Sequence, residues 1–494
     1  MGRIGFTTVG RGFTGRLARR EAAPYLFHFS VLLLFPLALA AQGSGPGAAA
    51  IYIPYSDAAP VLRALREDRL PPELRGKATA ELETEWSDWV RRRDAAIRAR
   101  VDEGAADSIV YLLQFGTAFT KQPRISEREL AGVVMRQAGS GASRLVPSPV
   151  LLSRIEDFIV AVASPGTNTR LQFAREVLTR RGIDPGTEAG RTELRRYLQD
   201  RVEKVGQAER LPRLLDPDGD PVDQMTLFRD RGLAPDTSIL VDFGIEETLA
   251  ALKSAGVLAE GAVRRVAIIG PGLDFTDKQE GYDFYPEQTI QPFAVIDSLI
   301  RLGLAGARDL RLTAFDLSPR VLQHLEAARI RARAGHPYTV FLPRNLDQPW
   351  APTLAQYWER FGDRIGESVK ATPAPVAAGR VAVRGVSIAP SVVLSVVPQD
   401  LNIVLQRVEP VSSDDQFDLV VATNLLLYYD VFEQSLATAN IARMLARGGV
   451  FLSNDRMIAL PGAPLSTAGY TTAIYLEAPG LGDRGDRFDW YRHR

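Results

Sequence analysis

The sequence predicts an α/β protein whose parallel sheet is covered by helices on both faces, preceded by a separate, mostly helical domain. Three observations lead to this prediction. Short apolar runs alternate with helical segments after Gly261, which is the pattern of a parallel sheet. From about residue 51 to residue 206, apolar side chains recur at helical spacing instead. A chain of 494 residues is also longer than one compact core usually requires.

Composition excludes several classes of protein and of site. Hydrophobic residues make up 46% and charged residues 24% of the chain, as in ordinary globular proteins. Lys and Arg together number 59, as do Asp and Glu, so no nucleic-acid partner is predicted. The absence of cysteine excludes disulfides, thiolate metal sites and cysteine nucleophiles. Because none of the four histidines has the i, i+4 spacing of a helical zinc site, no metal site is predicted. The histidines are His28, His324, His336 and His493.

Residues 1–42 are predicted to be a signal peptide or an N-terminal anchor. A basic stretch precedes the apolar run Tyr25 to Ala41, and Ala38-Leu39-Ala40 has the small-x-small pattern of a signal peptidase site. The apolar run is close to the lower length limit for crossing a bilayer, so an uncleaved anchor remains an alternative. This segment predicts export or membrane anchoring, with membrane association through the apolar run.

Residues 43–215 are predicted to form the helical domain. The pattern is clearest in four apolar residues at near-helical spacing: Trp86, Val90, Ile97 and Val101. Ser126-x-x-Glu129 and Ser153-x-x-Glu156 have the pattern of capping boxes. The arginine runs of this domain are interpreted as solvated helix faces. The acidic segment Asp216 to Asp220 is interpreted as a turn, because its glycine is misplaced for a calcium loop.

Residues 216–494 are predicted to hold the sheet. The apolar runs predicted as strands are 266–269, 310–315, 392–397, 417–423 and one that opens at Gly448. The first four lead into distinctive residues: Gly270-Pro-Gly272, Asp316, Asp400-Leu401 and Asn424. Ligands of such sheets bind outside the carboxyl ends of the strands. We therefore expect these residues to meet in one cleft.

The chemistry of these strand ends suits a nucleoside. Gly270 and Gly272 permit close approach of the backbone to a ligand, and Asp316 is placed to accept hydrogen bonds from ribose hydroxyls. Asp400 with Leu401 offers a polar acceptor and an apolar wall for adenine. A dinucleotide would require a third glycine in register, which is missing. Asp274 would repel a pyrophosphate but attract an ammonium, so the residues favour S-adenosylmethionine over a nicotinamide cofactor.

The segment from Phe417 to Asp430, FDLVVATNLLLYYD, resembles the FDLIFCRNVLIYFD segment of the chemotaxis-receptor glutamate methyltransferases. Further stretches agree in order with this family, from about Met225 to Ser453. They are Phe228-Arg229-Asp230, Gln291-Pro292-Phe293, Phe315-Asp316-Leu317-Ser318, Tyr357 to Phe361, and Val392 to Leu401, where Asp400 replaces an asparagine.

The resemblance implies a Rossmann-like class I methyltransferase fold with S-adenosylmethionine as cofactor. It implies cofactor binding by Gln291, Leu317 and Asn424 together with the strand-end residues above. It also implies that Arg229 and Tyr428 lie near the methyl group and a carboxylate or hydroxyl acceptor. A surface ion pair for Arg229 and core packing for Tyr428 remain alternatives.

Three departures from the family limit what the resemblance predicts about substrate and activity. The sequence has an extra stretch, Lys278 to Gln288, and Gln291 removes a charge that Asp274 or Glu287 would have to replace. The leader and the helical domain have no counterpart in the resemblance, so the methyl acceptor stays unidentified, whether protein side chain or small molecule. Since S-adenosylmethionine is a cytoplasmic metabolite, the leader supports an alternative function. The alternative is a catalytically silent, exported or membrane-anchored binding module on a methyltransferase fold.

Overall fold

The computed structural model describes residues 49–125, 148–208, 228–229, 231–234, 237–274, 282–410, 412–458, 464–477 and 484–494. The predicted leader, the Ser126 capping box and the acidic segment Asp216 to Asp220 lie outside these ranges. Among the residues that are described, no helix combines the length and hydrophobicity needed to cross a membrane.

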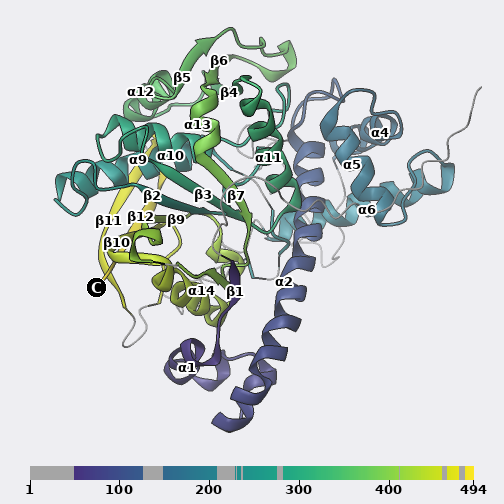
Figure 1. The fold of residues 1–494 in the computed structure, drawn as a ribbon. Coiled ribbons are helices and arrows are strands. Elements are labelled where there is room, and N and C mark those ends of the chain that lie inside the picture. The colour runs from purple at the N-terminus through teal and green to yellow at the C-terminus, as the bar shows by residue number, and fades with distance from the viewer. Residues whose placement is uncertain are drawn as a thin grey trace, which may run out of the picture. The chain divides into compact units, whose positions relative to one another are not determined.

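A seven-stranded, largely parallel sheet lies at the centre of the structure (Figure 1). Its strand order is β11-β12-β10-β9-β2-β3-β7. β12 runs antiparallel to both of its neighbours, β11 and β10, and the other neighbouring strands of this sheet are parallel to one another. The strands are β2 (Arg265–Ile269), β3 (Arg311–Asp316), β7 (Val396–Asp400), β9 (Phe417–Ala422), β10 (Leu445–Ser453), β11 (Leu465–Leu476) and β12 (Arg484–His493). The predicted Rossmann-like sheet is confirmed at this level.

The strand order reverses at β2, which pairs with β3 on one side and with β9 on the other. In register, Ile269 at the end of β2 pairs with Phe315 and with Ala422. Asp316 pairs with Asp400 at the end of β7. The carboxyl ends of these strands therefore meet at a topological switch point, which is where open α/β sheets bind their ligands.

Helices cover both faces of the sheet because side chains alternate along its buried strands. Val266 and Ile268 of β2 point into one core, and Ala267 and Ile269 point into another. The first core is covered by α9 (Ile239–Ser254), α10 (Gln291–Arg301), α11 (Pro319–Arg333), α12 (Pro352–Arg360) and α13 (Pro390–Ser395). The second is covered by α1 (Tyr55–Ala64), α2 (Thr79–Phe115) and α14 (Val431–Met444).

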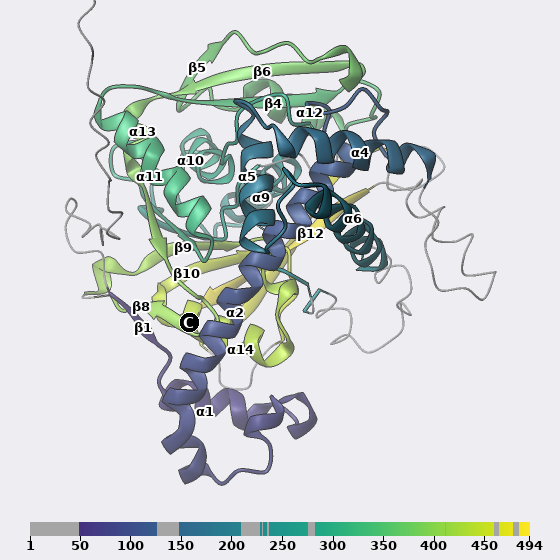
Figure 2. The same ribbon diagram turned by 90° about the vertical axis from the view of Figure 1, so that its right-hand side faces the viewer.

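The N-terminal region is helical as predicted, but its separation as a domain is not confirmed. Trp86, Val90 and Ile97 of α2 belong to the same core as Phe432 of α14. The second half of α2 instead packs with α4 (Pro149–Ala163), α5 (Thr169–Arg180) and α6 (Glu188–Ala208) (Figure 2). All these helices and the sheet fall in one compact unit, Ala48–Arg494. The predicted domain boundaries stay predictions.

Two local predictions are wrong, each for a physical reason. Residues 392–395 belong to α13, which begins with Pro390 in the first turn, where proline fixes a helical φ. The strand β7 follows, and Pro398 is tolerated there because β7 is an edge strand. Ser153 lies inside α4 and does not cap it. The helix begins earlier, and Ser148 caps it by accepting a hydrogen bond from the Leu151 N–H at 3.1 Å.

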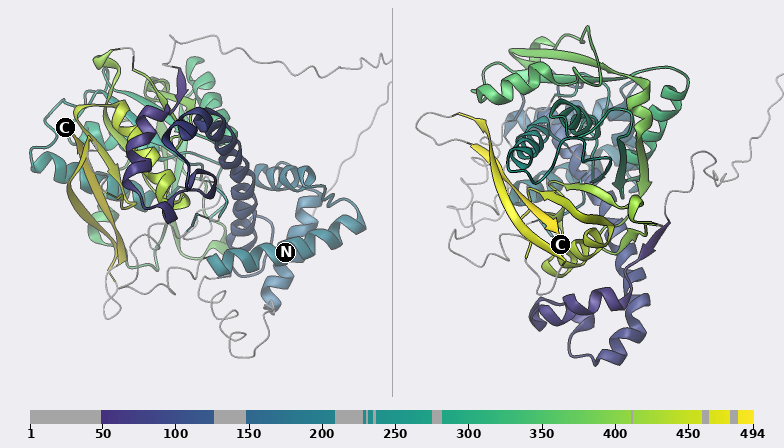
Figure 3. Two further views of the ribbon diagram at one scale, coloured as in Figure 1. Left: turned by 90° about the horizontal axis from the view of Figure 1, so that it is seen from below. Right: turned by 60° about the vertical axis from the view of Figure 1, so that its left-hand side comes forward.

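Smaller elements complete the fold (Figure 3). A three-stranded antiparallel sheet, β4-β6-β5, is inserted between β3 and β7. A two-stranded sheet joins the start of the described chain, β1, to β8. These strands are β1 (Ala50–Tyr52), β4 (Tyr338–Asn345), β5 (Gly366–Val369), β6 (Val381–Ile388) and β8 (Gln406–Val408). The 3-10 helices are η1 (Glu67–Arg69), η2 (Pro72–Leu74), η3 (Val376–Ala378), η4 (Ser413–Asp415) and η5 (Leu426–Tyr428).

Candidate functional site

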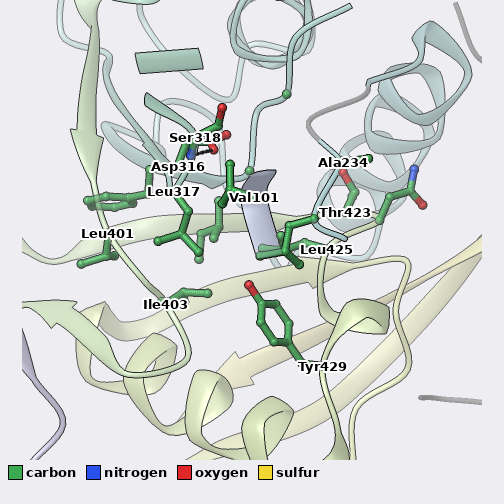
Figure 4. Close-up of a pocket in the computed structure, with 16 residues that line it drawn as sticks. Val101, Ala234, Asp316, Leu317, Ser318, Leu401, Ile403, Thr423, Leu425 and Tyr429 are labelled. Atoms are coloured by element: carbon green, nitrogen blue, oxygen red, sulfur yellow. Dashed lines mark hydrogen bonds between the residues drawn. The ribbon is translucent and has the colours of Figure 1, made fainter. Parts of the chain in front are cut away.

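A pocket lies at the carboxyl ends of β2, β3 and β9, where the sequence predicts a ligand (Figure 4). Six of the predicted cofactor-binding residues line it: Gly270, Gly272, Asp316, Leu317, Leu401 and Asn424. Asp274, Gln291 and Asp400 do not line it. The expectation of convergence on one cleft thus holds for most of the predicted set.

The turn after β2 has backbone geometry that favours glycine. Gly270 has φ +70° and Gly272 has φ +73°, both in the left-handed region. A Cβ atom on Gly270 would also lie 3.3 Å from Cδ1 of Leu425, which lines the same pocket. Glycine therefore keeps the backbone of this turn open to a ligand.

Asp316 ends β3 and presents its carboxylate at the pocket. The backbone N–H of Ser318 donates to Asp316 Oδ1 at 2.7 Å. Burial raises the pKa of Asp316 to about 7, offset in part by the backbone N–H groups of Ser318, Gly272 and Leu317, and raised further by the charge of Asp400. Near neutral pH this carboxyl is therefore poised between its neutral and ionised forms.

The walls of the pocket beside Asp316 are apolar. Leu401 and Ile403 follow β7 and are buried, and Leu317 follows β3. Val101 of α2 also lines the pocket (Figure 4). A carboxylate beside such walls can accept hydrogen bonds from hydroxyl groups while the apolar side chains pack on a flat ring.

Asp400 is placed differently from its prediction as an adenine acceptor. It is the register partner of Asp316, but its carboxylate is held by Arg98 of α2. Arg98 Nη1 lies 2.8 Å from Asp400 Oδ1 and 3.1 Å from Oδ2, and the Asp400 side chain is 55% exposed. Arg98 also donates to both carboxyl oxygens of Asp94. Asp400 therefore faces an arginine at the rim of the site.

Asn424 follows β9 and lines the pocket in a left-handed backbone conformation, with φ +53°. We expected a bound ligand to pair with the side-chain amide of Asn424, but Asn454 already takes up the oxygen of that amide. The Asn424 N–H donates to Asn454 Oδ1 at 2.8 Å, and Asn454 Nδ2 donates to Asn424 Oδ1 at 2.7 Å. The next residue, Asp455, accepts the N–H groups of Leu425 and Leu426.

Sequence reasoning missed this supporting pair, although a signal was present. Asn454 and Asp455 follow the end of β10, Ser453, so they are polar residues at the carboxyl end of a fifth parallel strand. Burial raises the pKa of Asp455 to about 6, offset in part by the backbone N–H groups of residues 425–427. The same strand-end argument applied to β10 would have identified both residues.

Asp274 is buried away from the pocket lining. Its Oδ2 accepts hydrogen bonds from the Tyr285 hydroxyl at 2.9 Å and from Gln288 Nε2 at 3.0 Å. Glu287, the other acid expected to replace the charge lost at Gln291, forms an ion pair with Arg320. In the described structure both acids are thus engaged by other side chains of the protein.

Gln291 is buried beneath the pocket and reaches it through Thr423, a lining residue. Gln291 Nε2 donates to Thr423 Oγ1 at 2.9 Å. Behind Gln291 lies Asp242 of α9, an acid that the sequence did not single out. Burial raises the pKa of Asp242 to about 8, offset only in part by the Gln291 amide. Asp242 is therefore largely protonated at neutral pH.

The predicted acceptor-side residues do not line the pocket. Arg229 is exposed. Tyr428 is buried with its ring centroid 6.2 Å from that of Phe228. The neighbouring Tyr429 lines the pocket in its place. The roles predicted for Arg229 and Tyr428 stay predictions.

The pocket has a wall contributed by α2 that sequence reasoning also missed. The backbone N–H of Leu233 donates to the Arg100 carbonyl of α2 at 2.9 Å. Leu233 and Ala234 line the pocket beside Val101. Nothing local in the sequence indicates that α2 reaches the sheet edge, because the contact joins segments distant in the chain. Among the described residues, no group of three or more His, Asp or Glu side chains is placed to hold a metal ion.

Comparisons with known proteins give structural similarity only. No family model matches the chain, and no curated protein matches it. One similar solved structure is magnesium protoporphyrin IX methyltransferase from Synechocystis PCC 6803 with bound SAM, at 11% identity over 58% of this chain and 90% of that chain, with a TM-score of 0.24. A second is trans-methyltransferase CalH in complex with SAH, at 12% identity over 82% of this chain and 92% of that chain, with a TM-score of 0.26. A third is CurJ carbon methyltransferase, at 13% identity over 84% of this chain and 98% of that chain, with a TM-score of 0.23. These values are too low to carry an argument about activity, and the narrower resemblance to chemotaxis-receptor methyltransferases is not shown.

Proposed function

We propose that this protein is an S-adenosylmethionine-dependent methyltransferase acting on an unidentified acceptor. The observation that carries the proposal is the meeting of the Asp316 carboxylate, the Gly270–Gly272 turn and an apolar wall in one pocket at the switch point of the sheet. An adenosyl group combines a diol, which needs a hydrogen-bond acceptor, with a flat apolar ring. The Asp316 carboxylate suits the diol as a hydrogen-bond acceptor, and the apolar wall suits the ring.

Different lining residues suit the ribose, the purine and the amino-acid end of the cofactor. Asp316 would accept the ribose hydroxyls, and Leu317 with Leu401 would pack on the purine. The open glycine turn and the Thr423–Asn424 segment would border the amino-acid end. Gln291 supports this end from behind through its hydrogen bond to Thr423.

S-adenosylmethionine, when bound, supplies a methyl group on a sulfonium that is already an excellent leaving group. The protein then has to position the partners and keep water out. Val101, Leu233 and Leu425 border the pocket with apolar surface suited to excluding water. By the resemblance to the chemotaxis-receptor family, the acceptor is a carboxylate or hydroxyl oxygen near Tyr428 and Arg229.

The location of the protein is a separate proposal. The predicted leader supports export or membrane anchoring, with an anchored domain facing the cytoplasm giving direct access to the cofactor. Fractionation of cells that express the chain with a C-terminal tag tests this. Protease protection of the tag in intact cells, together with its sensitivity after lysis, would support a cytoplasmic orientation.

Titration calorimetry of the purified protein with S-adenosylhomocysteine tests the proposed function. We expect saturable binding, and no binding of NAD at the same concentration. Asp347→Ala, which removes an exposed acid distant from the pocket lining, serves as a surface control and should bind like the wild type. No heat at millimolar S-adenosylhomocysteine would overturn the proposal. Binding without transfer of a labelled methyl group to any carboxylate or hydroxyl acceptor would instead favour the silent binding module.

A further inference from the structure

Tyr429 is one of two aromatic residues that line the pocket; the other, Phe315, carries no polar atom on its ring. It follows η5 in the loop after β9, and its side chain is almost fully buried, with 1% exposure. Figure 4 shows its hydroxyl pointing into the pocket between Ile403 and Leu425. No hydrogen bond to a group of the described residues acts on this hydroxyl, so it can bond a molecule in the pocket.

The chemotaxis-receptor methyltransferases that this chain resembles lack a hydroxyl at the position of Tyr429. FDLIFCRNVLIYFD has phenylalanine where this chain has Tyr429, and its tyrosine corresponds to Tyr428. A phenylalanine would fill the same space without a polar atom. The additional hydroxyl of Tyr429 therefore adds a polar group to an otherwise apolar part of the pocket.

The surroundings of Tyr429 set which role its hydroxyl can take. Burial raises the pKa of the Tyr429 hydroxyl well above its usual value, although the charges of Arg100 and Arg98 oppose this, and the carboxylates of Glu433 and Asp316 add to it. The phenol therefore stays protonated at neutral pH and can donate a hydrogen bond. The Arg100 guanidinium lies 5.6 Å from the centre of the ring and also donates to the Tyr428 carbonyl at 2.6 Å, which helps to fix the position of the ring.

We infer that Tyr429 is a ligand-binding residue whose hydroxyl donates a hydrogen bond to an acceptor atom of the molecule bound in this pocket. This inference rests on the proposed function, under which that molecule is S-adenosylmethionine. The acceptor atom is then a ring nitrogen or a ribose oxygen, because the hydroxyl lies beside the Ile403 wall and faces the Asp316 side of the pocket.

The test compares Tyr429→Phe with a matched control, Tyr357→Phe. Tyr357 is also fully buried, and its hydroxyl also lacks a hydrogen-bond partner among the described residues, but it lies in α12 and does not line the pocket. Calorimetry with S-adenosylhomocysteine should show about 3- to 10-fold weaker binding for Tyr429→Phe, the range of one neutral hydrogen bond. Tyr357→Phe should bind like the wild type. Without ligand, neither substitution should lower the melting temperature, because each removes a hydroxyl that has no protein partner.

The outcomes separate the two claims. Equal affinities of wild type and Tyr429→Phe would overturn the assignment of Tyr429 and leave the proposed function standing. A lower melting temperature of ligand-free Tyr429→Phe would also overturn it, because the hydroxyl would then be bonded within the protein. If the wild type itself binds no S-adenosylhomocysteine, the proposed function fails and this assignment fails with it.

Discussion

The guanidinium of Arg98, on α2, lies 2.8 Å from the carboxylate of Asp400 at the end of β7. This contact ties the N-terminal helices to the rim of the pocket. It also places a positive charge beside Asp400, whose own charge raises the pKa of the neighbouring Asp316. Arg98 therefore acts on the proposed ribose acceptor through Asp400.

Arg98→Gln should make binding of S-adenosylhomocysteine more sensitive to acid. Without the guanidinium, the charge of Asp400 is uncompensated and the pKa of Asp316 rises further. We expect the pH midpoint of binding to move up by about half a unit to one unit, on the scale of a nearby charge. Calorimetry between pH 5.5 and 9 measures this.

The double variant Arg98→Gln/Asp400→Asn should return the midpoint to the wild-type value or below it, because both charges are then absent. Arg91→Gln removes an exposed arginine from the same helix and should leave the midpoint in place. If the pH midpoint of binding were the same in Arg98→Gln as in the wild type, the charges of Arg98 and Asp400 would not affect the pKa of Asp316.

In the wild type, affinity for S-adenosylhomocysteine should rise as the pH increases from 6 to 8. The pKa of Asp316 is raised to about 7 by burial, and only the ionised carboxylate accepts two ribose hydrogen bonds. Asp316→Asn should bind about 10- to 100-fold more weakly at pH 8, the range for hydrogen bonds to a charged group. The affinity of Asp316→Asn should also stay constant between pH 6 and pH 8. A variant that kept both affinity and pH dependence would remove Asp316 from the site.

The strand-end rule predicts Gly270, Asp316 and Asn424 from sequence because it is local: each residue directly follows a buried apolar run. It cannot predict Val101, because the packing of α2 on the sheet edge depends on contacts between distant segments. The rule also identifies a residue at a strand end without showing which other residues of the protein bind its side chain. Arg98 on Asp400 and Asn454 on Asn424 both change what the predicted residue has left to offer a ligand.

The same limit separates Tyr428 from Tyr429. Both follow the same strand in a segment that is aromatic at each position, and the sequence alone does not show which ring faces the ligand. The conformation of η5 turns Tyr429 into the pocket and leaves Tyr428 against Phe228. The overall α/β class was predictable from two features of the sequence: the spacing of apolar residues and the alternation of strands with helices. Both features arise because the sheet is buried on its two faces, as the structure shows.

Asp242→Asn should stabilise the protein at alkaline pH. Burial raises the pKa of Asp242 to about 8, so the folded state binds a proton that the unfolded state has already lost above about pH 4. The wild type therefore loses stability as the pH rises from about 4 to about 8, at up to about 1.4 kcal/mol per pH unit. The asparagine is neutral throughout and lacks this loss.

Urea unfolding of both proteins at pH 5, 7 and 9 checks this prediction. The advantage of Asp242→Asn in free energy of unfolding should be small at pH 5 and grow toward pH 9. Asp347→Asn, at an exposed acid, should show no such trend. A constant difference across the three pH values would mean that Asp242 is ionised in the folded protein.

Gly104→Ala should disturb the wall that α2 and residues 231–234 build together. A Cβ atom at Gly104 would lie 1.9 Å from the Leu233 carbonyl oxygen and 2.6 Å from the Ala234 backbone nitrogen, so this backbone has to move away from the helix. Since Leu233 and Ala234 line the pocket, we expect weaker binding of S-adenosylhomocysteine. We also expect a loss of about 1–3 kcal/mol in stability, typical of overpacking.

Gly306→Ala is the matched control, because its Cβ would meet only the Asp309 carboxylate at 3.4 Å. Calorimetry and urea unfolding of both variants measure the two effects. Wild-type affinity in a destabilised Gly104→Ala would show that residues 231–234 pack on α2 without forming part of the ligand site.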